Sequence, residues 1–391
     1  IFTMMVFKAI IKYPSVRKYI FNRILNLFSL RFKKFKYKYE ENLKFDTHVE
    51  KILKNISDNF KLNIRLKDPI RKIIEANPID LEKKMNEKIS IINDNLKYKI
   101  KTNFSDLENK TIDVLEKGYT LLDSFKISSE DRLSVITKSK KIDCYNQHCN
   151  YLAHETKEPW QIQKQKSYYA SYDLEDIVKI DELCKIIFDP RICDLAYKTL
   201  GCIPTFYGLN LRWSFHTDGK LIGPQQFHRD IENLKCVNFI YNFTETNKGD
   251  GSHIYVQRTH NLNSLSKIFD VDKNLSIDPK YQIKNNMSPK DFFTLPFSGY
   301  GLNPLIEHYF KDNIKYILND NIPILENNYG FHAADVPMND RCVLLIHFAL
   351  SGSLPSASGS KDIKRIPYNN VSQYFDDNLN NRYIYRNLVK F

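Results

Sequence analysis

The chain has 391 residues, a formal net charge of +12 and 42% hydrophobic residues, which is enough to bury one large core. No uncharged run reaches the ~20 residues that a membrane-spanning helix needs, and the early apolar stretches are broken by charge without a small-residue cleavage site after them. The seven cysteines are an odd number and contain no Cys-x-x-Cys pair, which disfavours a disulfide framework and a zinc site. We therefore expect a reducing, cytoplasmic location.

The positive charge is confined to the first part of the chain. Residues 1–100 hold 23 Lys and Arg against 11 Asp and Glu, whereas residues 101–391 hold 35 of each. In residues 1–45, apolar and aromatic residues alternate with lysine and arginine at nearly helical spacing. Two interpretations stay open: a basic amphipathic helix in peripheral contact with an anionic membrane, or a helical arm packed on its own domain or on a second subunit. Nucleic acid is disfavoured as a partner, because no binding motif is recognisable and the remainder is neutral.

The chain divides into two predicted parts. Short amphipathic helices are predicted over residues 45–100, with interruptions at Pro69 and Pro78. We therefore group residues 1–105 as a basic helical N-terminal extension and residues 106–391 as a separate domain.

The first motif that carries chemistry lies in residues 225–243, which are predicted to enter a β-strand. His228 and Asp230 stand two positions apart, so in an extended chain their side chains project from the same side and can hold one ion. Arg229 points away from that side. A third ligand then has to come from a distant strand folded alongside.

His332 fits the third position, because it stands just before the apolar run 342–350, which predicts a buried strand. Arg341 opens that strand, and its planar guanidinium can hold a carboxylate through two parallel hydrogen bonds. Two histidines and one carboxylate on one face of an iron ion leave the opposite face free for a bidentate cosubstrate and dioxygen. This set of ligands indicates oxidation rather than hydrolysis.

Triplets of the form His-x-Asp/Glu also arise by chance, and this chain has three of them. His48-Val49-Glu50 lies in a charged helical stretch and is interpreted as a solvated face. His216-Thr217-Asp218 runs into a glycine, which indicates a strand end or a turn. Both rank below the motif at residues 228–230 as metal sites.

From about residue 112 to about residue 351, the sequence resembles the phytanoyl-CoA dioxygenase family of iron(II)- and 2-oxoglutarate-dependent oxygenases. Residues 115–131 are similar to the family's glycine, aromatic residue, short strand and helix begun by serine and acidic residues. Residues 225–230 match its first metal motif. Arg341 follows His332 by nine residues, close to the family's spacing.

One further segment resembles the family but differs from it at two positions. Residues 249–261 are similar to the family's hairpin, in which a strand ends in Pro-Gly-Ser/Thr-His, but here Gln257 and Arg258 replace the Pro-Gly. The loss of that glycine implies a different turn. His260 is then expected to be a turn residue.

The resemblance implies a mainly β fold with flanking helices: a double-stranded β-helix of the cupin jelly-roll type, preceded by the helical extension. It implies Fe(II) held by His228, Asp230 and His332, with 2-oxoglutarate as cosubstrate and O2 as oxidant. The far carboxylate of the oxo acid would pair with Arg341. Because the carboxylate ligand is present, we expect hydroxylation of an unactivated C–H bond in a small-molecule or lipid-like substrate, with succinate and CO2 as coproducts.

Two other positions bear on the cosubstrate. Enzymes of this family usually carry a polar residue on the strand before the first motif, and Asn210 stands at about that place; a slip in register would nominate Arg212 or Leu209 instead. A serine or threonine two residues after the distal histidine is also common in the family. This chain has Ala334 there, so one anchor for the cosubstrate is expected to be missing.

Two alternatives from other classes stay open. One is a cupin-type iron enzyme that works without an oxo acid, in which Arg341 would have no distal carboxylate to pair. The other is a non-catalytic jelly-roll binding protein. The presence of all three metal ligands together with Arg341 argues against the second alternative.

Overall fold

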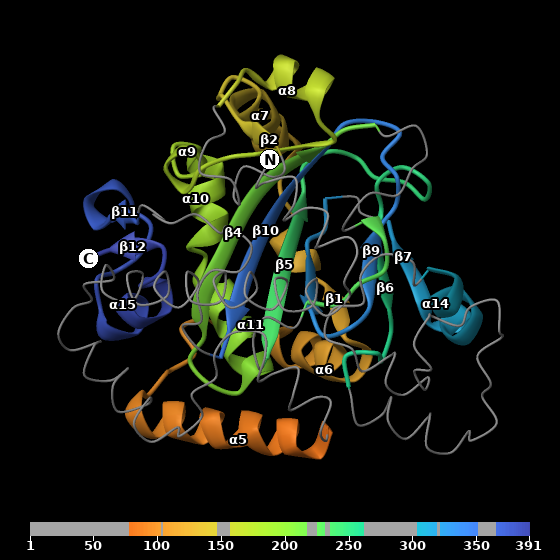
Figure 1. The fold of residues 1–391 in the computed structure, drawn as a ribbon. Helices are drawn as coiled ribbons and strands as arrows, with labels where there is room; N and C mark the ends of the chain where they lie inside the picture. Colours follow the sequence, from red (N-terminus) through yellow and green to blue (C-terminus); the bar gives the residue numbers. More distant parts are fainter. Residues whose placement is uncertain are drawn as a thin grey trace, which may run out of the picture. The chain divides into compact units, whose positions relative to one another are not determined.

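The computed structural model describes most of the chain beyond residue 77. The described residues are 78–102, 105–146, 157–216, 225–230, 235–261, 303–318, 321–350 and 365–391. Within them, two antiparallel sheets form the core, with helices around them (Figure 1).

The large sheet has seven strands, and every neighbouring pair in it is antiparallel. In spatial order they are β1 (Tyr119–Leu121), β8 (Ile324–Asn327), β5 (Cys236–Asn242), β10 (Arg341–Ala349), β4 (Thr205–Ser214), β3 (Tyr169–Ser171) and β2 (Tyr145–Asn146). The small sheet places β6 (His253–Val256) between β7 (Ile314–Ile317) and β9 (His332–Ala334). A short parallel pair joins β11 (Ile366–Pro367) to β12 (Val389–Lys390).

The two faces of the large sheet differ in what they pack against. Along β10, side chains alternate between the faces, and Val343 belongs to a small apolar cluster that also contains Tyr255 of β6 and Ile317 of β7. Its neighbours Cys342 and Leu344 belong instead to the main core with the helices. We call the face that carries Val343 the interior face, because it lies against the small sheet.

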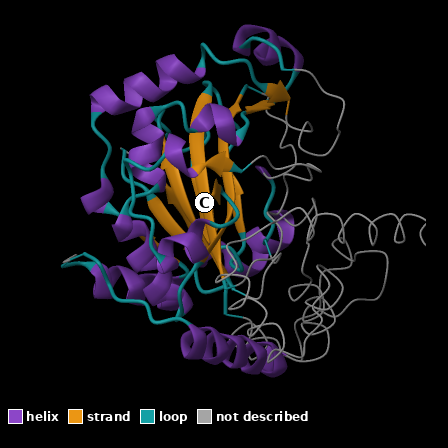
Figure 2. Ribbon diagram, turned by 90° about the vertical axis from the view of Figure 1, so that its left-hand side faces the viewer, coloured by secondary structure: helices purple, strands orange, loops and turns teal. Residues whose placement is uncertain are grey.

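Helices cover the opposite face, and Figure 2 shows most of them on one side of the strands. They are α6 (Leu107–Lys117), α7 (Ser129–Ser139), α8 (Trp160–Lys166), α9 (Leu174–Ile177), α10 (Asp181–Ile187), α11 (Pro190–Leu200) and α15 (Leu379–Tyr385). α14 (Asn303–Phe310) lies near the small sheet. Its buried Ile306 belongs to the same hydrophobic core as Ile254 of β6. The prediction of β-sheets with flanking helices is confirmed, and the strands of both sheets pair antiparallel.

Helix boundaries follow local chemistry. Ser128 caps α7 by accepting a hydrogen bond from the Asp131 backbone, as the sequence indicated. α11 begins with Pro190 after the capping residue Asp189, and it ends where Gly201 adopts a left-handed conformation with φ of +84°.

The helix α5 (Pro78–Asn95) begins at one of the two prolines that were predicted to interrupt helices. Its Ile92 and Leu96 just after it are buried in the main core, and Asn93 donates a hydrogen bond to the Gly201 carbonyl at 2.9 Å. Residues 1–77, including the basic segment 1–45, lie outside the described residues, so the membrane interpretation and the domain boundary at residue 105 stay predictions. No helix among the described residues is long and apolar enough to cross a membrane.

Candidate metal centre

The two candidate histidine ligands are brought together by the backbone. The His228 amide donates to the His332 carbonyl at 3.0 Å, and the His332 amide donates back to the His228 carbonyl at 2.9 Å. This isolated antiparallel bridge joins the loop before β5 to β9. A third backbone bond, from the Asp230 amide to the Asn328 carbonyl at 2.9 Å, fixes the carboxylate residue on the same frame.

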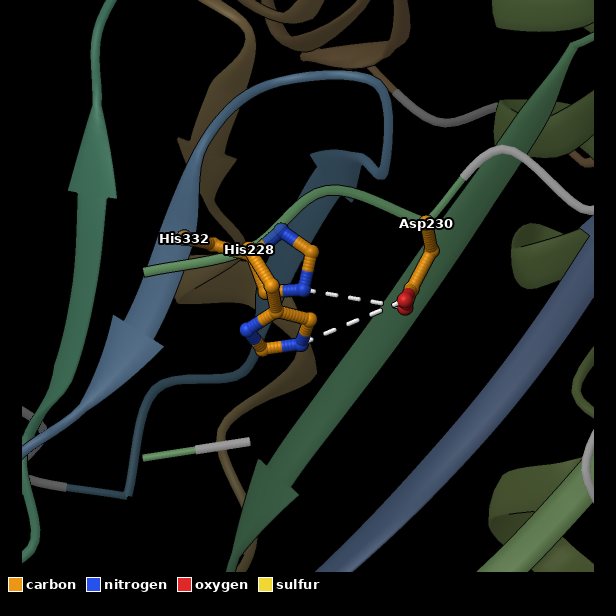
Figure 3. Close-up of side chains that lie close together, drawn as sticks. All are labelled: His228, Asp230 and His332. Atoms are coloured by element: carbon orange, nitrogen blue, oxygen red, sulfur yellow. Dashed lines mark ion pairs between the residues drawn. The ribbon is translucent and has the colours of Figure 1, made fainter. Parts of the chain in front are cut away.

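His228, Asp230 and His332 converge on one point, as Figure 3 shows. Their ligand atoms all lie within 4.8 Å of one another, and the two Nε2 atoms lie 3.9 and 3.6 Å from the Asp230 carboxylate. Two ligand bonds of about 2 Å each can bridge such separations through a single ion. The sequence-predicted set is thus assembled from residues a hundred positions apart.

The tautomers of the imidazoles suit a metal. Nδ1 of His228 lies 2.8 Å from the Gln226 carbonyl, and Nδ1 of His332 lies 2.9 Å from the Gly330 carbonyl. Because a carbonyl can only accept, each Nδ1 must carry the proton. In the neutral rings, both Nε2 lone pairs are therefore left to face Asp230, which is the usual way that proteins orient histidine ligands.

In the metal-free site, the two histidines differ in their tendency to carry a proton. Burial, helped by the neighbouring imidazole, lowers the pKa of His228 to about 4. Burial also opposes charge on His332, but the Glu326 carboxylate and the hydrogen bond with Asp230 outweigh it and raise its pKa to about 9. Against the effect of burial, the same two imidazoles lower the pKa of Asp230 below its ordinary range. A cation entering the site therefore meets an ionised carboxylate, and it has to displace a proton from His332.

Arg229 points away from the ligands, as predicted. It is fully buried, its Nη2 donates to the Thr259 carbonyl at 3.0 Å, and its guanidinium lies 4.0 Å from the centre of the Phe331 ring. The Phe331 amide in turn donates to Thr259 Oγ1 at 2.8 Å. Arg229 thus connects the segment that carries His228 to the one that carries His332.

A buried His–Glu pair beside the ligands was not predicted from the sequence. Nε2 of His253 on β6 lies 2.6 Å from the Glu326 carboxylate on β8, so the pair joins the two sheets. The His253 ring lies 6.0 Å from that of His332, at 30° to it. Despite burial, His253 and His332 lower the pKa of Glu326, which places a negative charge next to the ligand cluster. The two residues meet only because β6 belongs to the small sheet and β8 to the large sheet that faces it. No local sequence pattern predicts this contact.

Arg341 begins β10, as predicted, and is 5% exposed on the interior face. Its Nε donates to Asn242 Oδ1 at 3.0 Å, and burial together with the nearby Arg212 lowers its pKa to about 10. A small pocket opens beside it. Both guanidinium groups line this pocket, with Tyr169, Ser214, Gln225, Ala334, Asp335 and Pro337.

Two arginines and one carboxylate line this pocket, and the Asp335 carboxylate accepts hydrogen bonds from the Gly249 amide and Ser252 Oγ. Neither arginine forms an ion pair with a carboxylate among the described residues, while Gln225, Ser214 and Tyr169 add polar groups. Ala334 does line it, as expected of the position two residues after His332. Asn210 lies on the interior face of β4, one inward position beyond Arg212, and its contact with a cosubstrate stays a prediction.

The other sequence candidates lie elsewhere. His216 is exposed, and its Nδ1 lies 3.1 Å from the Pro337 carbonyl; Thr217 and Asp218 lie outside the described residues, as does His48. His260 is a turn residue whose Nε2 lies 3.0 Å from the Leu115 carbonyl. Arg258 adopts a φ of +67°, so the turn uses a left-handed residue even without a glycine.

Comparisons with known proteins give structural similarities only. No family model matches the chain, and no curated protein matches it in sequence. Among solved structures, the non-haem alpha-ketoglutarate-dependent epimerase SnoN from nogalamycin biosynthesis is 12% identical, with 63% of this chain and 83% of that chain covered and a TM-score of 0.39.

Two further solved structures are similar at the same level. HygX from Streptomyces hygroscopicus, with nickel and 2-oxoglutarate bound, is 11% identical over 63% of this chain and 88% of that chain, with a TM-score of 0.34. EctD from S. alaskensis, with 2-oxoglutarate and 5-hydroxyectoine, is 10% identical over 70% and 85%, with a TM-score of 0.39.

Proposed function

We propose that the chain is an Fe(II)- and 2-oxoglutarate-dependent dioxygenase of the phytanoyl-CoA dioxygenase type, which hydroxylates an unactivated C–H bond of a small molecule. The observation that carries this is the convergence of His228, Asp230 and His332, with both Nε2 atoms facing the carboxylate, on the same interior as the buried Arg341. Two facing antiparallel sheets with ligands between them are also the arrangement of a jelly-roll barrel.

The donor set fits iron. Two imidazoles and one carboxylate on one face are typical of oxygenases, whereas a tetrahedral structural zinc site would need a fourth ligand from the protein. No fourth His, Cys, Asp or Glu joins the cluster among the described residues. Iron(II) bound with 2-oxoglutarate would supply the oxidative decarboxylation that activates O2, giving succinate, CO2 and a hydroxylated product.

The chain's own residues have two tasks in this scheme. His228, Asp230 and His332 would hold the metal and contribute one negative charge. Arg341 would orient the cosubstrate by pairing with its far carboxylate, and its bond to Asn242 Oδ1 fixes the direction of the guanidinium. Because this arginine is buried and has no acidic partner among the described residues, an incoming carboxylate would find a desolvated cation without having to displace a protein carboxylate.

Uncoupled turnover tests the proposal without a known substrate. We expect the purified chain to release CO2 slowly from 1-labelled 2-oxoglutarate, only with Fe(II) and O2, with one succinate per CO2 and with loss of the activity in Asp230→Ala. Oxygen uptake that needs iron but not 2-oxoglutarate would instead indicate an oxo-acid-independent cupin-type enzyme. Bound iron with neither reaction would indicate a non-catalytic jelly-roll binding protein.

A further inference from the structure

We infer that the interior face of the large sheet binds the substrate through His347 and Asn238, and that this substrate is an uncharged molecule rich in hydroxyl groups. The inference rests on the proposed function and specifies the substrate class for it. His347 on β10 and Asn238 on β5 are direct cross-strand partners, and both lie on the face that carries Val343. We call these two side chains the polar pair.

Both members of the polar pair have a buried atom without a hydrogen-bond partner among the described residues. Asn238 is 5% exposed and its Oδ1 is unpartnered, while its Nδ2 reaches only Glu326 Oε1 at 3.5 Å. Nδ1 of His347 is likewise shielded and unpartnered. Buried polar atoms are nearly always paired, so two such atoms side by side indicate a surface that is completed by a ligand.

The position of the His347 ring is set by the strand on its other side. Gly208 of β4 stands opposite His347 in the register, and a Cβ added there would lie 3.0 Å from His347 Cδ2. The ring therefore lies against the bare backbone of Gly208, with the Tyr207 ring 5.5 Å away. A glycine at this point lets the imidazole stay over the sheet.

The polar pair lies near the metal ligands rather than near Arg341. The Sγ of Cys236, two residues before Asn238 on β5, lies 3.8 Å from the Asp230 carbonyl, and Asn238 Nδ2 lies 3.5 Å from Glu326, the partner of His253. Along β10, His347 is six residues from Arg341, which corresponds to roughly 20 Å of strand. A five-carbon oxo acid that reaches Arg341 from the metal cannot also cover the polar pair, so these two side chains are left for the second organic molecule.

The chemistry of the polar pair selects the substrate class. Asn238 Oδ1 can only accept a hydrogen bond, so the ligand must bring a donor. A carboxylate or phosphate at the pair would lie next to the buried Glu326 carboxylate, whose Oε1 is 3.5 Å from Asn238 Nδ2. Burial also lowers the pKa of His347 to about 4, so the ring gives no compensating positive charge at neutral pH. The nearby Glu326 already has His253 as its partner, which removes the obvious site for a cation.

An alkyl chain over the polar pair would leave both atoms unpaired and would bind poorly. A hydroxyl group can donate to Asn238 Oδ1 and exchange a hydrogen bond with His347 Nδ1 whichever tautomer the ring adopts. A molecule with several neighbouring hydroxyl groups therefore satisfies the pair, whereas a fatty acyl chain does not.

The test uses the full chain, anaerobic and loaded with Fe(II) and 2-oxoglutarate, and measures the iron-induced broadening of probe protons by NMR, with Zn(II)-loaded chain as the diamagnetic reference. The probes are methyl glucoside, sucrose and myo-inositol, against decanoate. We expect saturable broadening for at least one hydroxylated probe, with an affinity weakened roughly two- to tenfold in Asn238→Leu and in His347→Phe, the loss expected for one hydrogen bond. The exposed residues His308 and Asn370 give the matched control variants His308→Phe and Asn370→Leu, which should behave as wild type.

The affinity for 2-oxoglutarate distinguishes a loss of substrate binding from a loss of the site as a whole. The affinity for 2-oxoglutarate should be unchanged in Asn238→Leu and His347→Phe, and this unchanged affinity shows that both variants are folded. Saturable broadening of decanoate alone, no broadening of any hydroxylated probe, or unchanged broadening in both variants would each overturn the inference. Failure of the wild type to bind 2-oxoglutarate would instead overturn the proposed function.

Discussion

His228 and His332, 104 positions apart in the sequence, exchange two backbone hydrogen bonds, at 3.0 and 2.9 Å, in an isolated bridge. The bridge sets the spacing of the two imidazoles before any ion arrives, while each Nδ1 is held by a backbone carbonyl. The candidate site is therefore preorganised by main-chain contacts that substitution of a ligand side chain leaves in place.

Loss of one ligand should consequently abolish metal binding without unfolding the chain. We expect His332→Ala to weaken Fe(II) binding by more than the ~10- to 100-fold typical of changes around the ligands. Isothermal titration under anaerobic conditions measures the affinity, and the melting temperature of the metal-free protein serves as the control. His216→Ala, which removes an exposed histidine, should leave the affinity as in wild type.

Replacement of Arg341 should weaken the binding of the cosubstrate without changing the binding of the metal. We expect Arg341→Met to weaken 2-oxoglutarate binding about 10- to 100-fold, the ~1.5–3 kcal/mol of hydrogen bonds to a charged group, while Fe(II) affinity stays the same. Arg382→Met is the matched control, since Arg382 pairs with Asp377 at the surface. Equal 2-oxoglutarate affinity in wild type and Arg341→Met would contradict the role given to Arg341.

Metal binding should release a proton near neutral pH. The pKa of His332 is raised to about 9 in the metal-free site, with Glu326 as the largest favourable contribution, so the ring is protonated at pH 7 and must be neutral to bind. Apparent affinity should therefore rise with pH by up to about tenfold per unit between pH 7 and 9, and level off above the pKa. Titrations in buffers of different ionisation enthalpy count the protons.

Glu326→Gln tests whether the Glu326 carboxylate is the reason that His332 carries a proton in the metal-free site. Removal of the negative charge should lower the pKa of His332, so that fewer protons are released at pH 7 and the affinity depends less steeply on pH. The same pH dependence in wild type and Glu326→Gln would show that the carboxylate does not set the charge of His332.

Gly330 should tolerate no side chain. A Cβ at this position would overlap Tyr255, whose hydroxyl donates to the Asn327 carbonyl at 2.8 Å, and the Gly330 carbonyl holds Nδ1 of His332. We expect Gly330→Ala to destabilise the fold by ~1–3 kcal/mol and to weaken metal binding as well. Chemical denaturation measures the first effect. Gly249→Ala, with no atom within 4 Å of the added carbon, tests backbone conformation alone.

The sequence predicted the site best where local periodicity was enough. The two-residue spacing of His228 and Asp230 places both side chains on one side of an extended segment, and the apolar run after Arg341 marks a strand that the structure begins at that residue. His332 could be predicted as a third candidate ligand because it stands just before the same strand.

Other parts of the site depend on contacts that no local pattern encodes. The pairing of His253 with Glu326 needs β6 and β8 to face each other across two sheets, and the juxtaposition of His347 with Asn238 needs the register between β10 and β5. The choice between Asn210 and Arg212 shows the same limit: both point inward, and only the three-dimensional position of Arg341 puts Arg212 in its pocket.

The central claim is that one iron ion, held by His228, Asp230 and His332, chelates 2-oxoglutarate. Its most direct test is an anaerobic titration of the Fe(II)-loaded chain with 2-oxoglutarate, followed by the weak visible charge-transfer band of a chelated oxo acid. A saturable band in wild type that is absent in Asp230→Ala is the predicted result. Bound iron without a band, or an equal band in Asp230→Ala, would contradict it.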